Sequence, residues 1–404
     1  MIASRRQHGT RRALVISQLA LAVVLLSAAG LMLRSVQRLH GVRPGFDPSG
    51  VLTFDVPLPP ARYSSYEKVA AFHERLQQQL AALPGVTSVG ATTQLPLTGG
   101  GCAVVWVEDN PIQPGEVPPC VHPPLVSPGY FEAMGIPLRG RAPTWLETER
   151  KVAGVVVSRA LAEHFWPGEN PIGKGIRPNG QNPPYYRVIG VTGDVYTDAL
   201  DAPPTEVVYF PMIPDSGTWL WQPPTAMTVS VRTHLARPES LVPSVRHIVT
   251  AMDPEVPLGD VRTMTQVVAA SMTRVSFAML LLLLAAGLAL VLSAVGIYGV
   301  LSYMVTQRRG EIGVRMALGA GAREVRRLVV LQSLGLAGIG VGLGLVAAFA
   351  VTRVLRSMLF GVTPTDPITM AGVVVLLTAI AVLASWIPAH RAASVDPLVA
   401  LRSE

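Results

Sequence analysis

Four long apolar runs without charged residues constrain this chain more than any other feature. Each run lacks Asp, Glu, Lys, Arg and His and has about the 20 residues that an α-helix needs to cross ~30 Å of hydrocarbon. The runs occupy residues 13–33, 275–303, 328–351 and 368–387. Of the 404 residues, 50% are hydrophobic and only 15% are charged, which is little charge for a water-soluble surface. The sequence therefore predicts an integral membrane protein with four transmembrane helices.

The charges outside these runs are unevenly distributed. Residues 34–274 carry 19 basic and 21 acidic residues, and the rest of the chain carries 14 basic and 5 acidic residues. Basic residues gather on cytoplasmic segments beside membrane spans. Three segments here carry many basic residues. The one before the first run has Arg5, Arg6, Arg11 and Arg12, the one between the second and third runs has Arg308, Arg309, Arg315, Arg323, Arg326 and Arg327, and the one after the fourth run has His390, Arg391 and Arg402. The net charge of +7 thus indicates membrane topology rather than nucleic-acid binding.

The charge pattern predicts one topology for the whole chain. Residues 34–274 form an extracytoplasmic domain, and residues 352–367 form a short outside loop. The cytoplasmic parts are the N-terminus (1–12), the segment 304–327 and the tail (388–404).

Two features of this topology stay open. The basic start and first apolar run also resemble a signal peptide, but the run is long for one, so we favour a membrane span. Cys102 and Cys120 fall in the predicted outside domain, where an oxidising compartment would allow a disulfide. Two cysteines do not decide between a bridge and free thiols.

The outside domain reads as mixed α/β with an insertion. Apolar spacing predicts a β-α-β unit in residues 51–93 and a second one in residues 226–262. The proline-rich middle, residues 94–225, contains further strand-like runs and a strand-helix piece at 155–165. We therefore expect one subdomain built from the two outer units, with a second subdomain inserted into it. From Met264 a helical stretch is expected to continue without interruption into the second span.

The predicted spans contain residues that favour close helix packing, but they contain no charged residues that could line a path for a polar substrate. Small residues four apart let helices approach closely, either within one chain or between two copies. The third run has two such pairs, Gly338/Gly342 and Gly340/Gly344. No ionisable residue lies within any of the four runs, whereas ion-coupled carriers need such groups at the membrane midplane. An autonomous secondary transporter is therefore disfavoured.

Motifs for catalysis are incomplete. Residues 168–175 (GENPIGKG) match a phosphate-binding loop except that Gly175 replaces the Ser or Thr that binds Mg²⁺, so we expect a turn. His73-Glu74 begins a zinc motif, but Gln77 occupies the position of the second His. No G-x-S-x-G sequence is present. We expect no catalytic, cofactor-binding or metal-binding residues and no enzyme activity of the chain itself.

The segment between the second and third runs has amphipathic helical character. In residues 308–320 (RRGEIGVRMALGA), Ile312 and Met316 stand among charged residues. Glu311 precedes Arg315 by four residues, which is the favourable order for a helical ion pair. Such a helix lies on lipid or docks into a groove of a partner.

Several longer strings resemble known permeases. Residues 296–303 (GIYGVLSY), 308–320, 364–367 (PTDP) and 388–402 resemble the FtsX-like permease domain, which would span 275–397. The outside domain is similar to the MacB-type periplasmic domain at 126–131 (VSPGYF), 165–174 (FWPGENPIGK) and 188–194 (VIGVTGD). Together the chain resembles ABC transporter permeases, in particular the second half of the duplicated permeases often called ADOP.

This resemblance implies a function and partners. Such a permease works as a dimer with a second copy or half, and binds a separate ATPase whose movements reshape the outside domain without passing substrate through the bundle. The outer α/β units would then be a porter-like subdomain, and ATP would act only through the partner ATPase. The expected coupling residues are Arg309, Glu311, Ile312, Arg315 and Met316. The expected location is the bacterial inner membrane, with lipid and envelope efflux or adaptor proteins as further partners and no nucleic acid.

Two other hypotheses stay open beside this mechanically coupled export system. The chain could be a non-transporting membrane scaffold that regulates an envelope partner, or an inactive orphan half of a permease. The substrate does not follow from the resemblance.

Overall fold

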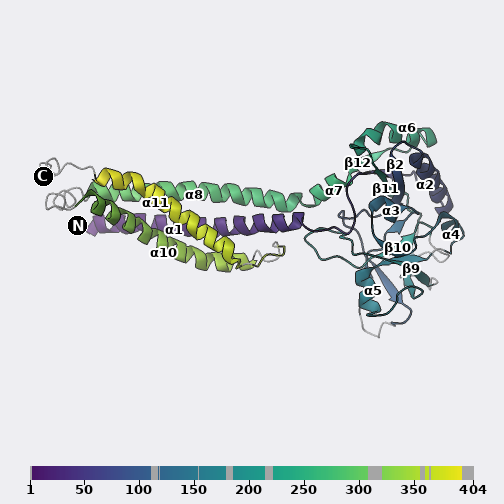
Figure 1. Ribbon diagram of the computed structural model, residues 1–404, viewed down its shortest axis with the longest axis horizontal. Coiled ribbons are helices and arrows are strands. Elements are labelled where there is room, and N and C mark those ends of the chain that lie inside the picture. Colours follow the sequence, from purple (N-terminus) through teal and green to yellow (C-terminus); the bar gives the residue numbers. More distant parts are fainter. Residues whose placement is uncertain are drawn as a thin grey trace. The chain divides into compact units, whose positions relative to one another are not determined.

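The computed structural model divides the chain into two compact units (Figure 1). The membrane bundle comprises Met1–Gly41 and Arg274–Glu404, and the outside domain comprises Val42–Thr273. The structure describes residues 2–110, 117, 119–152, 154–178, 185–213, 222–307, 321–354, 360–363 and 365–393.

Four long helices form the described part of the membrane bundle. They are α1 (Ile2–His40), α8 (Thr273–Gln307), α10 (Ala322–Val354) and α11 (Pro367–Ala393). Each contains a stretch long and apolar enough to cross a membrane: Arg12–His40, Val275–Gln307, Arg323–Arg353 and Pro367–Arg391. The predicted fold class of four transmembrane helices with a large outside α/β domain is confirmed.

Branched and small apolar side chains fill the interior of the bundle. Helix α10 packs along both α1 and α11, and α8 is the least buried of the four helices. The interior includes Leu19, Val23, Ile297, Val341 and Leu377. The outer surface is also apolar, as the exposure of Phe277, Leu288, Val346 and Leu383 illustrates. A surface of this kind is stable in lipid, where apolar side chains need no burial by protein.

Two β-α-β units build the frame of the outside domain. The first consists of β1 (Val51–Pro57), α2 (Tyr66–Ala81) and β2 (Val86–Thr92). The second consists of β11 (Ala226–Thr233), η1 (Pro238–Leu241), α6 (Val242–Met252) and β12 (Gly259–Thr263). Their strands lie in the order β12-β1-β11-β2, with antiparallel neighbours.

The two faces of this frame carry different helices. Apolar residues of α2 and α6, such as Phe72, Leu76 and Val245, share one hydrophobic core with Val89 and Ala91 of β2. Successive strand residues point to opposite faces, so Gly90 faces the other side. There α3 (Tyr130–Met134) packs so closely that a Cβ on Gly90 would lie 2.3 Å from the Cα of Tyr130.

The inserted segment forms a second core with its own helix. Its strands are β3 (Ala103–Val107), β4 (Cys120–Val121), β5 (Leu125–Val126), β6 (Leu138–Gly140), β7 (Val155–Ser158), β8 (Gly175–Pro178), β9 (Tyr186–Thr192) and β10 (Val208–Pro211). Helix α5 (Arg159–Phe165) covers β7 and β9, whereas α4 (Trp145–Glu149) packs its Trp145 on the frame. The second core includes Leu161, Trp166 and Phe210.

Hydrogen bonds join the two cores through short strands. Strand β5 pairs with β2 of the frame and with β10 of the insertion, and β10 in turn pairs with β7. In the described residues, the strand order therefore runs from the frame through β5-β10-β7-β9-β8-β3-β4, with β6 beside β9.

The expected uninterrupted helix into the second span is interrupted. Helix α7 (Met264–Ser271) ends in a turn at Met272, and α8 begins at Thr273. The start of α7 is fixed by a capping box, in which the Thr263 hydroxyl accepts from the Gln266 N–H and the Gln266 side chain accepts from the Thr263 N–H. Because its Met264 and Val267 are buried, α7 belongs to the packing of the outside domain.

Candidate functional site

The predicted coupling residues occupy the connection between α8 and α10. Arg309, Glu311, Ile312, Arg315 and Met316 lie outside the described residues. Helix α8 ends at Gln307, and α10 begins at Ala322. This end of the bundle also contains the start of α1 and the end of α11 (Figure 1).

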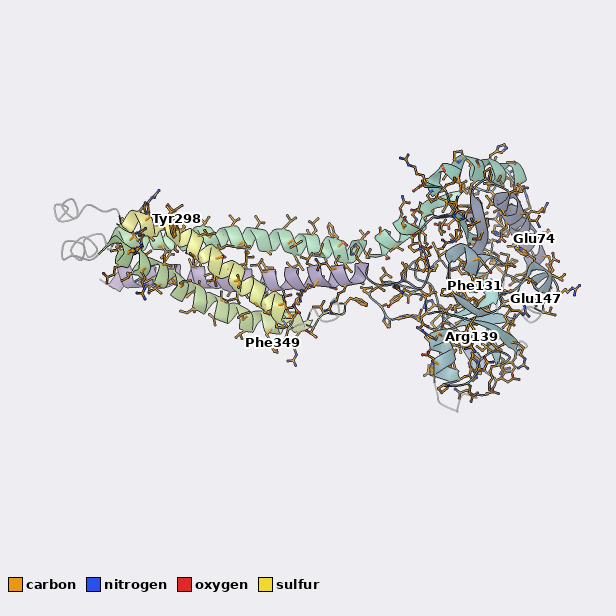
Figure 2. The ribbon with its side chains drawn as sticks, viewed as in Figure 1. Glu74, Phe131, Arg139, Glu147, Tyr298 and Phe349 are labelled. Carbon is orange, nitrogen blue, oxygen red and sulfur yellow. A yellow bond between two sulfur atoms is a disulfide. The ribbon has the colours of Figure 1, made fainter. Side chains whose placement is uncertain are left out.

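Basic side chains crowd the same end of the bundle. The Arg12 guanidinium lies 3.7 Å from the Met304 sulfur, and Arg391 donates to the Tyr298 hydroxyl at 3.3 Å. Figure 2 marks the position of Tyr298 toward this end of the bundle. The first turns of α10 add Arg323, Arg326 and Arg327. A hollow of about 400 Å³ on α10 is lined by Glu324, Arg327, Leu328, Leu331 and Gln332. The end therefore combines positive charge with an accessible apolar strip.

The four paired glycines of α10 (Gly338, Gly340, Gly342 and Gly344) lie on two faces of the helix. A Cβ on Gly340 would lie 2.6 Å from the Cβ of Leu19, and a Cβ on Gly344 would lie 2.6 Å from the Cβ of Val23. At Gly338 and Gly342 the added atom would meet nothing within 4 Å in the described structure. The pair Gly340/Gly344 therefore packs α10 against α1 within this chain, whereas the other pair lies on an open face.

A polar clamp fastens α1 to the beginning of α11 at the opposite end. Asp366 pairs with Arg34 and accepts from the Thr369 N–H at 2.8 Å and the Thr369 hydroxyl at 2.6 Å. Nearby, the Ser35 hydroxyl accepts from the Phe360 N–H at 2.9 Å. The PTDP string therefore contains a helix cap, which sequence reasoning missed. The signal was Asp before Pro at a helix start with Thr three residues later.

The cysteines and the glycine-rich loop of the outside domain have structural roles. Cys102 and Cys120 form a disulfide beside the pairing of β3 with β4. The Lys174 amine lies 2.7 Å from Asp109 and 3.1 Å from Glu169, so its charge is already paired. The expected turn at 168–175 is present, because Lys174 N–H bonds to the Pro171 carbonyl and Gly173 has a φ of 94°.

A buried carboxylate ties the two halves of the frame together. Asp253, which follows α6, accepts from Arg62 at 2.7 Å and from the Tyr63 hydroxyl at 2.9 Å, both in the loop before α2. Burial raises the pKa of Asp253, but the hydrogen bonds from Glu255, Tyr63 and Arg62 outweigh it and hold this pKa below its usual value. Asp253 therefore carries its charge inside the folded domain.

Two residues of the incomplete zinc motif on α2, His73 and Gln77, are buried in the domain. His73 is fully buried, and neither ring nitrogen has a hydrogen-bond partner among the described residues. Burial alone lowers the pKa of His73 to about 4. Gln77 instead bonds to the buried Ser127 hydroxyl, which accepts from the Ala91 N–H at 2.7 Å. No cluster of three metal-binding side chains occurs in the part of the chain that the structure describes.

The architecture defines a multi-span membrane protein that carries a large outside domain between its first two spans. Two family models match it. The MacB-like periplasmic core domain matches residues 13–263, and the FtsX-like permease C-terminal domain matches residues 283–397. The chain belongs to the MacB/FtsX-like family of ABC transporter permeases.

Individual relatives match parts of the chain. A macrolide export ATP-binding/permease protein MacB from Azoarcus sp. (strain BH72) is 27% identical over 267 residues, or 64% of this chain and 39% of the relative. MacB from Shigella sonnei is 32% identical over 126 residues, or 31% of this chain and 19% of the relative. The chain thus spans well under half the length of these relatives. The periplasmic region of MacB from Actinobacillus actinomycetemcomitans aligns with 59% of this chain and 99% of that structure, at 14% identity and a TM-score of 0.37.

Proposed function

We propose that this chain is the permease subunit of an ABC-type export system that is mechanically coupled to a separate ATPase. The observation that carries the proposal is the presence of both matched permease domains in one chain. In this proposal, ATP-driven closure of the partner moves the bundle, and the bundle moves the outside domain. The chain itself is not an enzyme and binds ATP only through its partner.

The apolar bundle interior favours movement of the outside domain over transport through the bundle. The described interior is built from residues such as Val15, Ala22, Leu301 and Ala381. A polar substrate would need hydrogen-bonding or charged groups along a path between the helices. We therefore expect the free energy of ATP hydrolysis to displace helices of the bundle. These helices are connected along the chain to the outside domain through α7 and α8.

The basic end of the bundle is where we place the ATPase. Cytoplasmic segments are enriched in Lys and Arg, so we place this end on the cytoplasmic side of the membrane, together with both termini. The membrane in this proposal is the bacterial inner membrane. The connection 308–320 then contacts the ATPase through Arg309, Glu311, Ile312, Arg315 and Met316. The hollow on α10 beside Leu328 and Leu331 extends this surface with apolar area. A second permease copy or half completes the dimer, and envelope efflux or adaptor proteins meet the outside domain.

The test is to purify the tagged chain from its native membranes in mild detergent and to measure bound ATPase and ATP hydrolysis. The wild type should retain an ATP-binding subunit, and Glu311→Ala/Arg315→Ala should lose most of it. The matched control is Glu74→Ala/Arg75→Ala, which removes the same two residue types from α2 of the outside domain and should retain the ATPase.

The absence of any ATPase from the wild type, under conditions that preserve a known ABC complex, would contradict the proposal. The scaffold or orphan-half hypothesis would then replace it. Equal ATPase retention in both double variants would instead contradict the role assigned to the 308–320 segment.

A further inference from the structure

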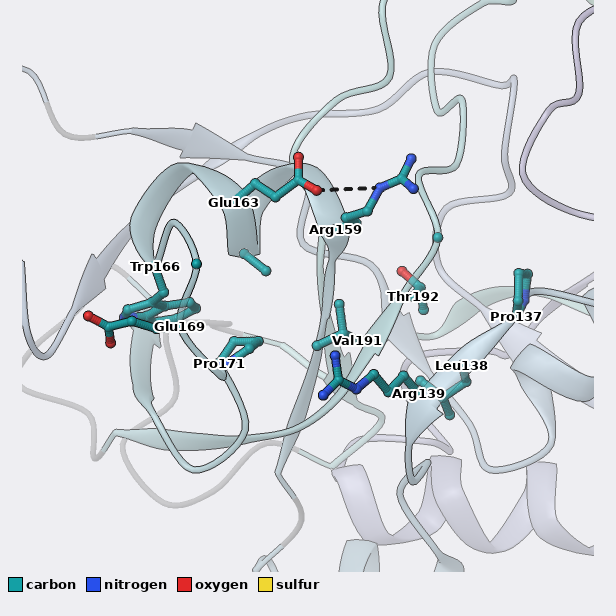
Figure 3. A pocket seen from close by; sticks show the side chains of 13 residues that line it. Pro137, Leu138, Arg139, Arg159, Glu163, Trp166, Glu169, Pro171, Val191 and Thr192 are labelled. Carbon is teal, nitrogen blue, oxygen red and sulfur yellow. Dashed lines mark ion pairs between the residues drawn. The ribbon is translucent and has the colours of Figure 1, made fainter.

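A pocket of about 500 Å³ opens beside α5 in the inserted subdomain (Figure 3). Helix α5 is short and leaves part of the sheet beside it uncovered, where β6 pairs with the end of β9. The apolar part of the lining comes from Leu138, Ala162, Pro171 and Val191. A volume of this size lies within the range of small-ligand sites, which span about 300–1,000 Å³.

The walls of the pocket are fixed by internal ion pairs and hydrogen bonds. Asp194 accepts from Arg159 at 2.6 Å and from the Ala160 N–H at 2.7 Å, which holds the first turn of α5. Lys174 holds the opposite loop through Glu169. Arg159, Glu169 and Lys174 therefore have their charges satisfied by neighbours, and the pocket is formed without a ligand.

Two other charged side chains of the pocket, Arg139 and Glu163, are exposed and are held less firmly by protein partners. The exposed Arg139 guanidinium has no hydrogen bond or ion pair to another residue within the described part of the chain. Glu163 has one ion pair in the described residues, to Arg159 at 3.8 Å, and Arg159 bonds more closely to Asp194. Figure 3 shows Arg139 and Glu163 on opposite sides of the pocket, with Val191 between them. The pocket thus offers a cation and a carboxylate separated by apolar surface.

We infer that this pocket binds a short apolar peptide with free ends. Arg139 would bind the terminal carboxylate, because a guanidinium forms paired hydrogen bonds with a carboxylate. Glu163 would bind the terminal ammonium, and apolar side chains would cover Leu138, Pro171 and Val191. A phospholipid fits this arrangement less well, since its headgroup holds both charges at one end. The site requires no ATPase, so it stands independently of the proposed export function.

Equilibrium dialysis of radiolabelled trileucine against the full chain in phosphatidylcholine nanodiscs tests the inference. Trileucine should bind saturably, and both trileucine amide and N-acetyl-trileucine should bind about tenfold more weakly, which corresponds to about 1.4 kcal/mol. Arg139→Gln should weaken trileucine and abolish the preference over the amide. Glu163→Gln should abolish the preference over the acetylated peptide. Both side chains are exposed, so neither substitution is expected to unfold the domain.

Matched controls remove the same charges elsewhere on the outside domain. Arg246→Gln on α6 and Glu239→Gln on η1 should leave trileucine binding and both preferences unchanged. The inference fails if trileucine does not bind saturably, if Arg139→Gln keeps the preference over the amide, or if Arg246→Gln weakens binding equally. Competition by phosphatidylethanolamine in the nanodiscs that depends on Arg139 would identify a lipid site and overturn the assignment to peptide.

Discussion

Two buried polar side chains of the outside domain, Asp253 and His73, differ in whether they have hydrogen-bond partners. Asp253 is surrounded by donors from Arg62, Tyr63 and the Glu255 N–H, so burial does not prevent its ionisation. His73 is also buried but has no partner for either ring nitrogen in the described structure. An unpartnered buried group lowers stability, and a protonated one lowers it further.

Replacing His73 by Leu should make the outside domain less sensitive to acid. The pKa of His73 is lowered to about 4 in the folded state, below the ordinary 6.5 of the unfolded chain. The unfolded state therefore binds the proton first, and wild-type stability falls as the pH drops from about 6.5 to about 4. The unfolding temperature of His73→Leu in the full chain should change less over this range. At pH 8 it should equal or exceed that of the wild type, because an unpartnered polar group is removed.

His247→Leu provides the comparison, since His247 lies exposed on α6. It should retain the pH dependence of the wild type. The same slope in His73→Leu and the wild type would show that His73 is hydrated or paired in solution.

Helix α10 shows at the element scale how one repeated residue type serves two faces. Residues four apart share a face of a helix, so Gly340/Gly344 and Gly338/Gly342 form separate stripes. Both stripes are visible in the sequence, but the sequence does not indicate which of them packs against α1. The structure shows that Gly340/Gly344 does. Gly344 is especially confined, because an added Cβ would also lie 2.9 Å from the Ala20 carbonyl oxygen.

Gly344→Leu should separate α10 from α1, and Gly342→Leu should not. Overpacking of this kind costs about 1–3 kcal/mol, whereas Leu at an open helical position is tolerated and has the higher helix propensity. The expected result is a lower unfolding temperature of the bundle for Gly344→Leu alone, measured on the full chain in detergent. Equal losses in both variants would indicate that the face of Gly342 is covered as well.

The elements that could be predicted from sequence are those with strong periodicity. The four spans and both outer β-α-β units follow from apolar patterns that a single segment carries by itself. The bounds of single strands are less predictable: in the predicted unit 226–262, the last strand begins only at Gly259, because Val256 N–H bonds back to the Asp253 carbonyl in a turn. The clamp between Arg34 and Asp366 joins residues 332 positions apart, and no local pattern reports such a contact. The interruption at Met272 likewise arises from the packing of α7, which periodicity does not show.

The whole molecule consists of two units with separate hydrophobic cores. The disulfide belongs only to the outside domain, where it closes a separation of 18 residues. In the chain-entropy account, such a bridge stabilises the domain by about 2–4 kcal/mol. Because the bundle shares none of this covalent constraint, loss of the bridge should affect the two units unequally.

Cys102→Ala/Cys120→Ala should therefore lower the unfolding temperature of the outside domain and leave that of the bundle unchanged. Calorimetry of the full chain in detergent, with and without a reducing agent, measures both. Reductant should destabilise the wild type and have no effect on the double variant. A parallel loss in both units would show that they unfold together as one cooperative structure.

The position of the inserted subdomain has an evolutionary consequence. Strands β2 and β11 are antiparallel neighbours, with Thr92 opposite Thr228, and the insertion runs from the end of one to the start of the other. In topology, the inserted segment between β2 and β11 is therefore an enlarged hairpin loop. Its two ends lie side by side at the sheet. Its length and sequence can therefore change while the strand order of the frame is kept. The inserted subdomain can thus change in size or sequence without redesign of the frame strands that it interrupts.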